Sequence, residues 1–196
     1  MTTYSQAFEA AVNHAMLYEV GGFWKLTPEV EAGLCETKEQ KRATGYTLDP
    51  VDPGGETKFG VAKNANQDVD IKALTWEGAK EIYYNRYWVA GKCDRLPARL
   101  AVLHFDGCVN HGIKRAAMFL QRAVETRPDG DIGDATLAKV KLVDEDRTCS
   151  KICDLREQFY RDIVTAKPTQ AKYLTGWLRR ISEMRAFVLD KTKTFA

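Results

Sequence analysis

Apolar residues recur at spacings of three and four along much of the chain, which is the pattern of helices with one buried face. The first such stripe runs through residues 8–16, and Glu19 continues it. Gly21 and Gly22 come next and are expected to end the helix. The pattern therefore predicts a carboxyl group on the inward side of a helix end.

Helices are also predicted over most of the second half of the chain. Residues 98–124 are too apolar for a surface and are expected to form the central helices of the core. Thr75 can cap a helix that begins after it, a second helix is expected to be capped near Asp134, and a last one to run from about Leu174 to Asp190. The sequence thus predicts a mainly α-helical protein.

Two stretches interrupt the helical pattern. Residues 25–48 are polar and charged without sustained periodicity, as in an inserted loop with one short helix around Glu36 to Ala43. Residues 49–60 have the Pro and Gly content of consecutive turns, and the apolar pair Phe59 and Val61 fits a small strand or hairpin. The expected fold class is therefore mainly α with a small β-hairpin element, an α+β arrangement.

The chain has 196 residues, 44% of them hydrophobic, which is enough for one core and too few for two independent domains of ordinary size. We expect a single domain over residues 1–196, with one lobe over 1–95 that carries the insertion and a helical lobe over 96–196. The net charge is +2, but residues 147–196 hold eleven Lys or Arg against five Asp or Glu. Such a basic stretch could bind nucleic acid, anionic lipid or acidic cell-wall polymers, or could be a solvated helix surface.

Five cysteines without a CxxC pair argue against a disulfide framework or a zinc ribbon. Cys149 and Cys153 share a helix face, but none of the three histidines is near them in sequence, so we expect buried thiols, no metal site and no cofactor. The N-terminal residues lack the basic start and apolar run of a signal peptide. No run of about twenty apolar residues occurs, so no membrane-spanning segment is predicted either.

The candidate catalytic residues are Glu19, Asp52 and Thr57, in this order along the chain. Cleavage of a glycosidic bond needs one protonated carboxyl to give its proton to the leaving oxygen, and a second polar group to place water or carry charge. Partial desolvation of Glu19 favours its protonated form, although a surface glutamate at a frayed helix end is the plain alternative. Glu56 and Asp49 are rivals for the second carboxylate, and Glu56 is otherwise expected to contact the substrate. The trio predicts a glycosidase.

Further residues are candidates for binding a sugar. Tyr84, Tyr87 and Trp88 can stack on the apolar faces of pyranose rings, although core packing is the simpler role for each of them alone. Asp106 and Asn110 are four residues apart in the predicted core helices. Buried polar groups must be hydrogen-bonded, so this pair either braces the fold or faces a cleft.

The segment DPGGETKFGV, residues 52–61, resembles the DPGG-x-T-x-x-G-I motif of glycoside hydrolase family 108, the N-acetylmuramidases found mainly as phage endolysins. The similarity continues through YYNRYW, residues 96–124, DGDIGDATL and GWLRRISEMR. The later part resembles a region often described as a peptidoglycan-binding module. The resemblance implies a lysozyme-like fold, with the β element beside the cleft, and cleavage of the β-1,4 bond between N-acetylmuramic acid and N-acetylglucosamine.

The resemblance also implies roles for single residues. Glu19 matches the motif glutamate, the proton donor, and Asp52 and Thr57 resemble the pair of the phage-type lysozymes that positions water or stabilises the oxocarbenium-like state. The family motif places its glutamate directly before two glycines, whereas Val20 intervenes here. One extra helical residue rotates the residues after it by about 100 degrees, so the aim of Glu19 depends on how the backbone accommodates Val20. The insertion at residues 25–48 could act as a lid, a sugar contact or an inhibitory flap.

From the resemblance we expect an endolysin-type muramidase that hydrolyses bacterial peptidoglycan and lyses the host cell. A lytic transglycosylase and a non-catalytic peptidoglycan-binding protein are the alternatives, and a nucleic-acid binder is a more distant one. We expect a monomer that binds no nucleic acid and does not insert stably into membranes. It would stay in the host cytoplasm until a holin gives it access to the periplasm and cell wall, and a secreted antibacterial effector would look similar.

Overall fold

The computed structural model describes residues 3–49 and 54–195. These residues form two compact units. Residues 12–85 make up one unit, the hairpin unit, and the rest make up the other, the helical unit. The division after Asn85 lies ten residues before the lobe boundary expected near residue 95, and the first residues of the chain group with its C-terminal half.

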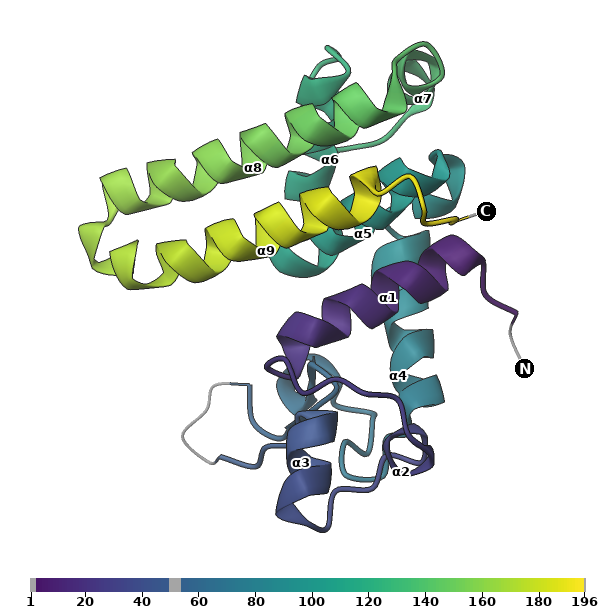
Figure 1. Ribbon diagram of the computed structural model, residues 1–196, viewed down its shortest axis with the longest axis vertical. Coiled ribbons are helices and arrows are strands. Elements are labelled where there is room, and N and C mark those ends of the chain that lie inside the picture. The colour runs from purple at the N-terminus through teal and green to yellow at the C-terminus, as the bar shows by residue number, and fades with distance from the viewer. Residues whose placement is uncertain (1–2, 50–53, 196) are drawn as a thin grey trace. The chain divides into compact units, whose positions relative to one another are not determined.

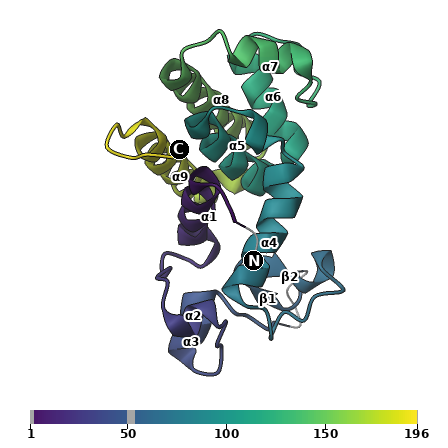
Figure 2. The ribbon, with the colours of Figure 1, turned by 90° about the vertical axis from the view of Figure 1, so that its right-hand side faces the viewer.

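The hairpin unit consists of short helices and a two-stranded sheet. In chain order it contains the second part of α1 (Gln6–Glu19), α2 (Pro28–Glu31), α3 (Lys38–Thr44), β1 (Thr57–Lys58), β2 (Val61–Ala62), η1 (Lys63–Ala65) and α4 (Trp76–Tyr83). Figure 2 shows the two strands next to α4. Thr75 caps α4 as predicted, because its side chain accepts the N–H of Gly78 at 3.2 Å.

The two strands form a tight hairpin. They are antiparallel, and Lys58 lies opposite Val61. The two residues between them, Phe59 and Gly60, have φ angles of 51° and 72°. A two-residue type I′ turn needs positive φ at both of these positions. The small β element predicted at Phe59 and Val61 is confirmed, with Phe59 in the turn rather than in a strand.

The insertion contains regular structure of its own. Thr27 caps α2 by accepting a backbone N–H. Thr37 begins α3 with a capping box, in which its Oγ1 accepts from Gln40 N at 3.2 Å and Gln40 Oε1 accepts from Thr37 N at 3.1 Å. Gly45 ends the helix with φ 64°. The short helix expected around residues 36–43 is confirmed as α3, whereas the single turn of α2 is too short to show a period in the sequence.

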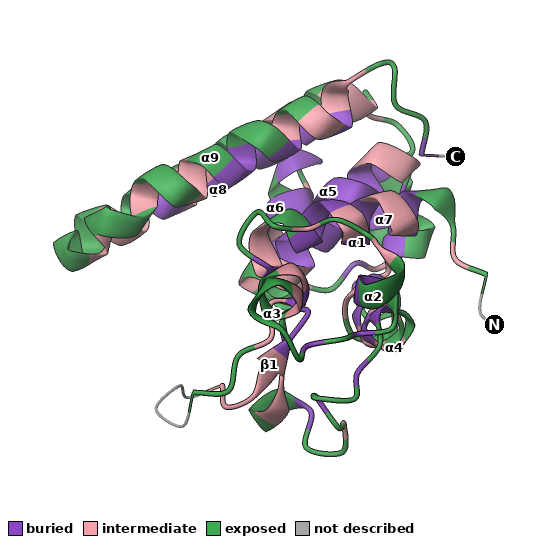
Figure 3. Cartoon of the chain, turned by 60° about the horizontal axis from the view of Figure 1, so that its bottom comes forward, coloured by how far each residue is buried: buried purple, intermediate pink, exposed green. Residues whose placement is uncertain are grey.

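The helical unit is built from longer elements. After η2, a π-helix (Tyr84–Val89), come η3 (Cys93–Arg95), α5 (Ala98–His111), α6 (Ile113–Ala123), α7 (Asp134–Val140), α8 (Glu145–Ala166), η4 (Pro168–Gln170) and α9 (Ala171–Leu189). α8 and α9 lie side by side, connected through η4 (Figure 1). The predicted core stretch 98–124 forms α5 and α6, and α5 is buried along most of its length (Figure 3).

An aromatic cluster fixes the start of α1 within the helical unit. The ring of Phe8 lies edge-on to those of Trp88 and Phe105, with centroid distances of 5.4 and 5.8 Å. None of the three side chains is more than 3% exposed. Edge-to-face pairs add to the stabilisation that burial alone provides. This explains why the first turns of α1 belong with residues so far along the chain.

In the part of the chain that the structure describes, no helix combines the length and apolar character needed to cross a membrane.

Candidate active site

Glu19 is the last residue of α1, and its side chain is half-buried. Val20 still makes a helical hydrogen bond, from its N–H to the carbonyl of Met16 at 3.1 Å, before two glycines turn the chain away. The Val20 side chain is 5% exposed and packs against Gly45, where an added Cβ would lie 3.0 Å from Val20 Cγ1. The residue that separates the glutamate from the glycines is therefore packed at the C-terminal end of α3.

The carboxyl group of Glu19 lies beside the tip of the hairpin. A Cβ added to Gly60 would be 3.2 Å from Oε2 of Glu19 and 3.1 Å from the Glu19 Cβ. The same added atom would collide with the hydroxyl of Tyr83. With its positive φ as well, this position suits only glycine. The close approach of the hairpin to Glu19 thus depends on Gly60.

Hydrogen bonds from two helices hold the turn in place. The Tyr83 hydroxyl, at the end of α4, donates to the carbonyl of Phe59 at 3.0 Å. The N–H of Phe59 donates to the carbonyl of Thr44, at the end of α3, at 2.7 Å. A bulky residue with positive φ is strained, so the surrounding contacts must fix it. These bonds keep the turn in its strained conformation next to Glu19.

The side chain of Phe59 anchors the turn in an aromatic cluster. It is 0% exposed, and its ring centroid lies 5.6 Å from that of Trp76 and 6.2 Å from that of Trp24. The two tryptophan centroids are 4.6 Å apart. Trp24 Nε1 donates to Asn13 Oδ1 at 3.3 Å, which ties the cluster to α1. The helix that carries Glu19 and the turn beside it therefore share one core.

Thr57 and Glu56 come from the same hairpin. Thr57 pairs with Thr47 through two backbone hydrogen bonds of 2.9 Å, and its hydroxyl donates to the carbonyl of Gly55 at 3.4 Å. Glu56 Oε1 accepts from the Tyr46 hydroxyl at 2.7 Å. This hydrogen bond, with burial and the negative charge, raises the pKa of Tyr46 to about 12. The carboxylate of Glu56 is thus already engaged by a neighbouring phenol.

Asp52, the remaining residue of the predicted trio, lies outside the described residues, so its role beside Thr57 stays a prediction. Its rival Asp49 is described and is exposed. What the structure brings together is the glutamate at the end of α1 and the C-terminal half of the DPGGETKFG segment.

Known proteins are similar to this chain in both sequence and fold. The family model of Glycosyl hydrolase 108 matches residues 40–112, and that of a Predicted Peptidoglycan domain matches residues 115–182. The structure of Brucella abortus SagA is similar, with 31% sequence identity, a TM-score of 0.61, and coverage of 76% of this chain and 90% of that chain. The chain belongs to the glycosyl hydrolase 108 family. None of the curated proteins matches it.

Membership of this family makes the protein a glycoside hydrolase that degrades peptidoglycan. The expected lysozyme-like, mainly helical fold with a small antiparallel sheet is confirmed. The first family match includes the hairpin and Tyr83 but begins after Glu19. The second match covers most of the helices of the helical unit.

The aromatic residues proposed to stack on sugars occupy different environments in this hydrolase. Tyr84 and Tyr87 are half-buried and lie on the π-helix η2. Short π-helical segments are rare and occur frequently at functional sites. Trp88, on the same segment, is 3% exposed and packs on Phe8 and Phe105. Tyr84 and Tyr87 therefore remain candidates for sugar contact, whereas Trp88 serves the core.

Asp106 and Asn110 both make hydrogen bonds within the helical unit. Asp106 is 0% exposed, and its carboxylate accepts from Arg156 Nη2 at 2.6 Å and Arg180 Nη2 at 2.8 Å. Burial alone would raise the pKa of Asp106, but the charges of Arg180 and Arg156 outweigh it and lower this pKa. Asn110 Nδ2 donates to the Tyr160 hydroxyl at 2.6 Å. Of the two roles left open by the sequence, the contacts support bracing for Asp106, whereas Asn110 is exposed and its contact with sugar stays a prediction.

The insertion also forms a hollow on the hairpin unit. Its volume is about 840 Å³. The guanidinium of Arg42 lies 4.0 Å from the centroid of the Phe23 ring at this place. Cationic, anionic and apolar side chains all contribute to the lining, which consists of Phe23, Lys25, Thr27, Glu29, Val30, Thr37, Lys38, Glu39, Gln40, Arg42 and Ala43. A hollow of this composition can contact hydroxyls, carboxylates and apolar groups.

Three residues that build this site were not among the predicted site residues. Gly60 allows the close approach, Tyr83 holds the turn, and Trp24 supports it. For Gly60 there was a signal, because a Phe-Gly pair between two strand residues fits a two-residue turn. For Tyr83 the signal was its helical spacing from Trp76, which puts both on the buried face of α4. No local pattern marks Trp24.

Proposed function

We propose that this hydrolase is a muramidase that cleaves the β-1,4 bond between N-acetylmuramic acid and N-acetylglucosamine, with Glu19 as proton donor. The placement of the Glu19 carboxyl against the Gly60 turn supports the proposal. It joins the end of α1 to the segment that carries the family motif. A half-buried carboxyl beside a turn that hydrogen bonds hold in place is suited to donate a proton at a fixed point.

The proposed reaction uses two polar groups in turn. Glu19 gives its proton to the glycosidic oxygen as the bond from this oxygen to C1 of the sugar breaks, and positive charge develops on the ring. Asp52 stabilises this charge or, with Thr57, positions a water molecule. The hydroxyl of this water bonds to C1, its remaining proton passes to Asp52 or to solvent, and Glu19 is reprotonated. The products are a new reducing end and a new free hydroxyl.

We predict that Glu19→Gln lowers the rate of peptidoglycan hydrolysis by roughly 100- to 10,000-fold, because an amide cannot supply the proton. The assay is the clearing of purified peptidoglycan, with the circular dichroism spectrum as the check on folding. Glu81→Gln is the matched control, since Glu81 is an exposed glutamate of the same unit. Full activity of Glu19→Gln would remove Glu19 as the acid. Binding without clearing by the wild type would favour a non-catalytic peptidoglycan-binding protein.

We also predict that the second carboxylate is Asp52 rather than Glu56. Asp52→Asn and Thr57→Val should each lower kcat by at least about tenfold, because they remove the group that carries charge or orients water. Glu56→Gln should change kcat by less than about threefold, because its amide oxygen can still accept the Tyr46 hydrogen bond. The reverse order of effects would assign the role to Glu56.

The products separate hydrolysis from the main alternative reaction. A muramidase releases muropeptides with a reducing end, whereas a lytic transglycosylase forms a 1,6-anhydro end and adds no water. Mass spectrometry distinguishes the two, because the anhydro product is lighter by one water molecule. Anhydro products from the wild type would overturn the muramidase proposal while leaving Glu19 as the acid.

For the biological setting we propose an endolysin that acts as a monomer and lyses the host cell once a holin lets it reach the cell wall. The family membership and the match to a predicted peptidoglycan domain support this setting. The test is expression in a bacterial host with and without a coexpressed holin. Lysis that needs both the holin and Glu19 is the expected result. Lysis of neighbouring cells by protein exported from intact producers would favour a secreted effector.

A further inference from the structure

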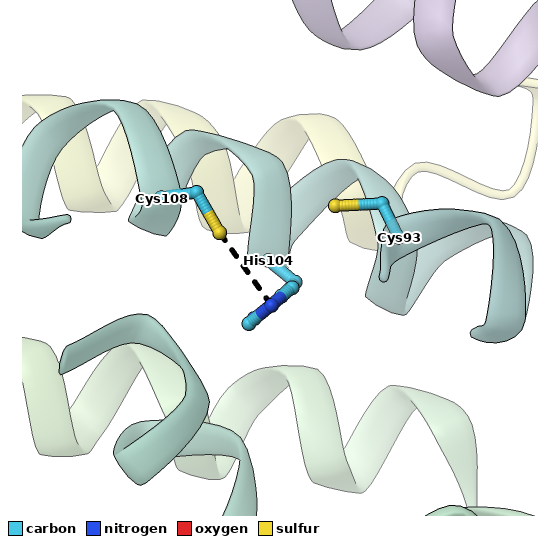
Figure 4. Close-up of side chains that lie close together, drawn as sticks. All are labelled: Cys93, His104 and Cys108. Carbon is cyan, nitrogen blue, oxygen red and sulfur yellow. Dashed lines mark hydrogen bonds between the residues drawn. The ribbon is translucent and has the colours of Figure 1, made fainter. Parts of the chain in front are cut away.

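Two thiols and one imidazole meet in the helical unit, outside the candidate active site. Cys93 belongs to η3, and His104 and Cys108 are one turn apart on α5 (Figure 4). The three residues are 0%, 3% and 0% exposed. Their possible ligand atoms all lie within 4.8 Å of one another, and no other group of three His, Cys, Asp or Glu among the described residues does this.

The distance between Cys108 and His104 fits two ligands of a tetrahedral ion. Cys108 Sγ lies 3.5 Å from Nε2 of His104. Zinc binds sulfur at about 2.3 Å and nitrogen at about 2.0–2.1 Å, so a sulfur and a nitrogen ligand of a tetrahedral zinc lie about 3.5–3.6 Å apart. The imidazole and the thiol are therefore already at the separation that a shared ion requires.

The backbone of Gly91 comes close to the two sulfurs and offers a further donor atom. Its carbonyl oxygen lies 3.0 Å from the same Nε2 of His104. A Cβ on Gly91 would be 2.9 Å from Cys108 Sγ and 3.4 Å from Cys93 Sγ, closer than a carbon and a sulfur comfortably approach. The missing side chain thus lets the Gly91 backbone lie close to both sulfurs. Two sulfurs, one nitrogen and one oxygen together make up a four-ligand set.

We propose that Cys93, His104 and Cys108 bind one zinc ion, with the Gly91 carbonyl as fourth ligand. Two thiolates and an imidazole select soft or borderline ions such as zinc over magnesium and calcium, which prefer oxygen ligands. With four ligands from the chain and no exposed position, this is a structural site. The ion would tie η3 to α5 and so fix the segment that comes after the π-helix η2.

Binding balances in protons and charge. The two thiols lose one proton each to solvent, so Zn²⁺ and two thiolates form a neutral centre. His104 stays neutral and carries its proton on Nδ1, which frees Nε2 for the metal. The Gly91 carbonyl oxygen then gives up its hydrogen bond with His104 Nε2 and coordinates the ion instead. Because the site is buried, metal has to enter while the chain folds, so metal binding and folding are coupled.

The test refolds the full chain with one metal at a time. Protein unfolded in denaturant with a chelator is exchanged into metal-free buffer and refolded with Co²⁺ or Zn²⁺ alone. The variant Cys93→Ser/Cys108→Ser is compared with Cys149→Ser/Cys153→Ser. The control pair is equally buried but lies within a single helix, α8, and does not belong to the cluster with His104.

We expect about one cobalt per chain in the wild type and the control, with the thiolate-to-cobalt charge-transfer absorption of a tetrahedral site. The Cys93/Cys108 variant should retain less than about a tenth of this metal, and zinc should raise Tm only in the proteins that keep the site. A wild type without this absorption overturns the proposal, even if the variant fails to fold. Equal metal in both double variants also overturns it, as does a Cys93–Cys108 disulfide in place of the metal, seen as a peptide pair lighter by two hydrogens.

Discussion

At the scale of single residues, the candidate acid depends on neighbours that carry no catalytic chemistry. Val20 separates Glu19 from the glycines, yet it is buried against Gly45 and leaves Glu19 beside the hairpin. Gly60 admits the carboxyl because it lacks a side chain, and Tyr83 fixes the turn through one hydrogen bond. The position of the proton donor is therefore set by packing around it.

We predict that Gly60→Ala lowers the free energy of unfolding by about 2–4 kcal/mol and reduces peptidoglycan hydrolysis. Alanine is strained at positive φ, and its Cβ would collide with the Tyr83 hydroxyl. Tyr83→Phe alone should cost about 1–2 kcal/mol, because the buried Phe59 carbonyl loses its donor. The double variant should be destabilised by less than the sum, since the collision is gone.

Urea unfolding of these variants and the wild type gives the comparison. Gly176→Ala is the control, because an added Cβ there has no atom within 4 Å and α9 is helical at this position. This change should stabilise the protein by about 0.5–1 kcal/mol. If the changes in unfolding free energy of Gly60→Ala and Tyr83→Phe add strictly, the added methyl group and the Tyr83 hydroxyl do not interact.

At the scale of elements, the insertion is specified locally. The capping box of Thr37 and Gln40 begins α3, and Gly45 ends it in the left-handed conformation. The end of α3 in turn supplies the Thr44 carbonyl that accepts the N–H of Phe59. The insertion thus supports the hairpin turn from one side and also forms the hollow lined by Phe23 and Arg42.

We predict that Thr37→Ala destabilises α3 by about 1 kcal/mol, since it removes the side-chain acceptor of the capping box. Hydrogen–deuterium exchange should become faster in residues 38–45, with little change in α8. Thr37→Ser keeps the hydroxyl and is the control. An unchanged exchange rate in Thr37→Ala would mean that contacts with the rest of the hairpin unit, and not the cap, hold α3.

At the scale of the whole molecule, much of the basic C-terminal half is used inside the protein. Arg156 and Arg180 are 0% and 9% exposed and bind Asp106. Arg185 binds Asp154 at 2.7 Å and Glu157 at 2.9 Å. The sequence could not distinguish these internal ion pairs from a cationic surface, because a count of charged residues does not show whether their side chains point inward or outward. Some of the excess basic residues of this half therefore form ion pairs within the protein.

The same network makes stability depend on pH. Burial, with the charge of Arg156, lowers the pKa of His111 to about 3, whereas its pKa in the unfolded chain is about 6.5. A lowered folded pKa means that neutral His111 contributes stability fully above about pH 6.5 and that this contribution is lost as the pH falls toward 3. Asp106 titrates in the unfolded chain only near pH 4, below most of this window.

We therefore predict that the free energy of unfolding falls by about 1.4 kcal/mol per pH unit below pH 6 on account of His111. Urea unfolding between about pH 7 and pH 4.5 measures this slope. His111→Gln keeps an acceptor for Arg156 Nε and does not titrate, so its slope should be smaller by this amount. Equal slopes in both proteins would show that His111 is as easily protonated in the folded state as in the unfolded one.

The sequence by itself determined the features that arise from neighbouring residues. Apolar spacing placed α1, α5, α6 and α9, Thr75 marked the start of α4, and the Phe59 to Val61 pair marked the hairpin. The DPGGETKFGV segment was enough to indicate the family, which the comparisons confirmed. These signals are local, since caps, turns and helix periods depend on residues a few positions apart.

Only the tertiary structure decided which distant side chains meet. It placed Glu19 beside Gly60, paired Asp106 with two arginines, and brought Cys93 close to Cys108. The sequence pattern drew attention to Cys149 and Cys153 because they are close along the chain, and gave no sign of the cluster because Cys93 is on another element. Such contacts depend on how helices pack, and residue spacing does not encode that packing, because side chains far apart in sequence become neighbours only once the core has formed.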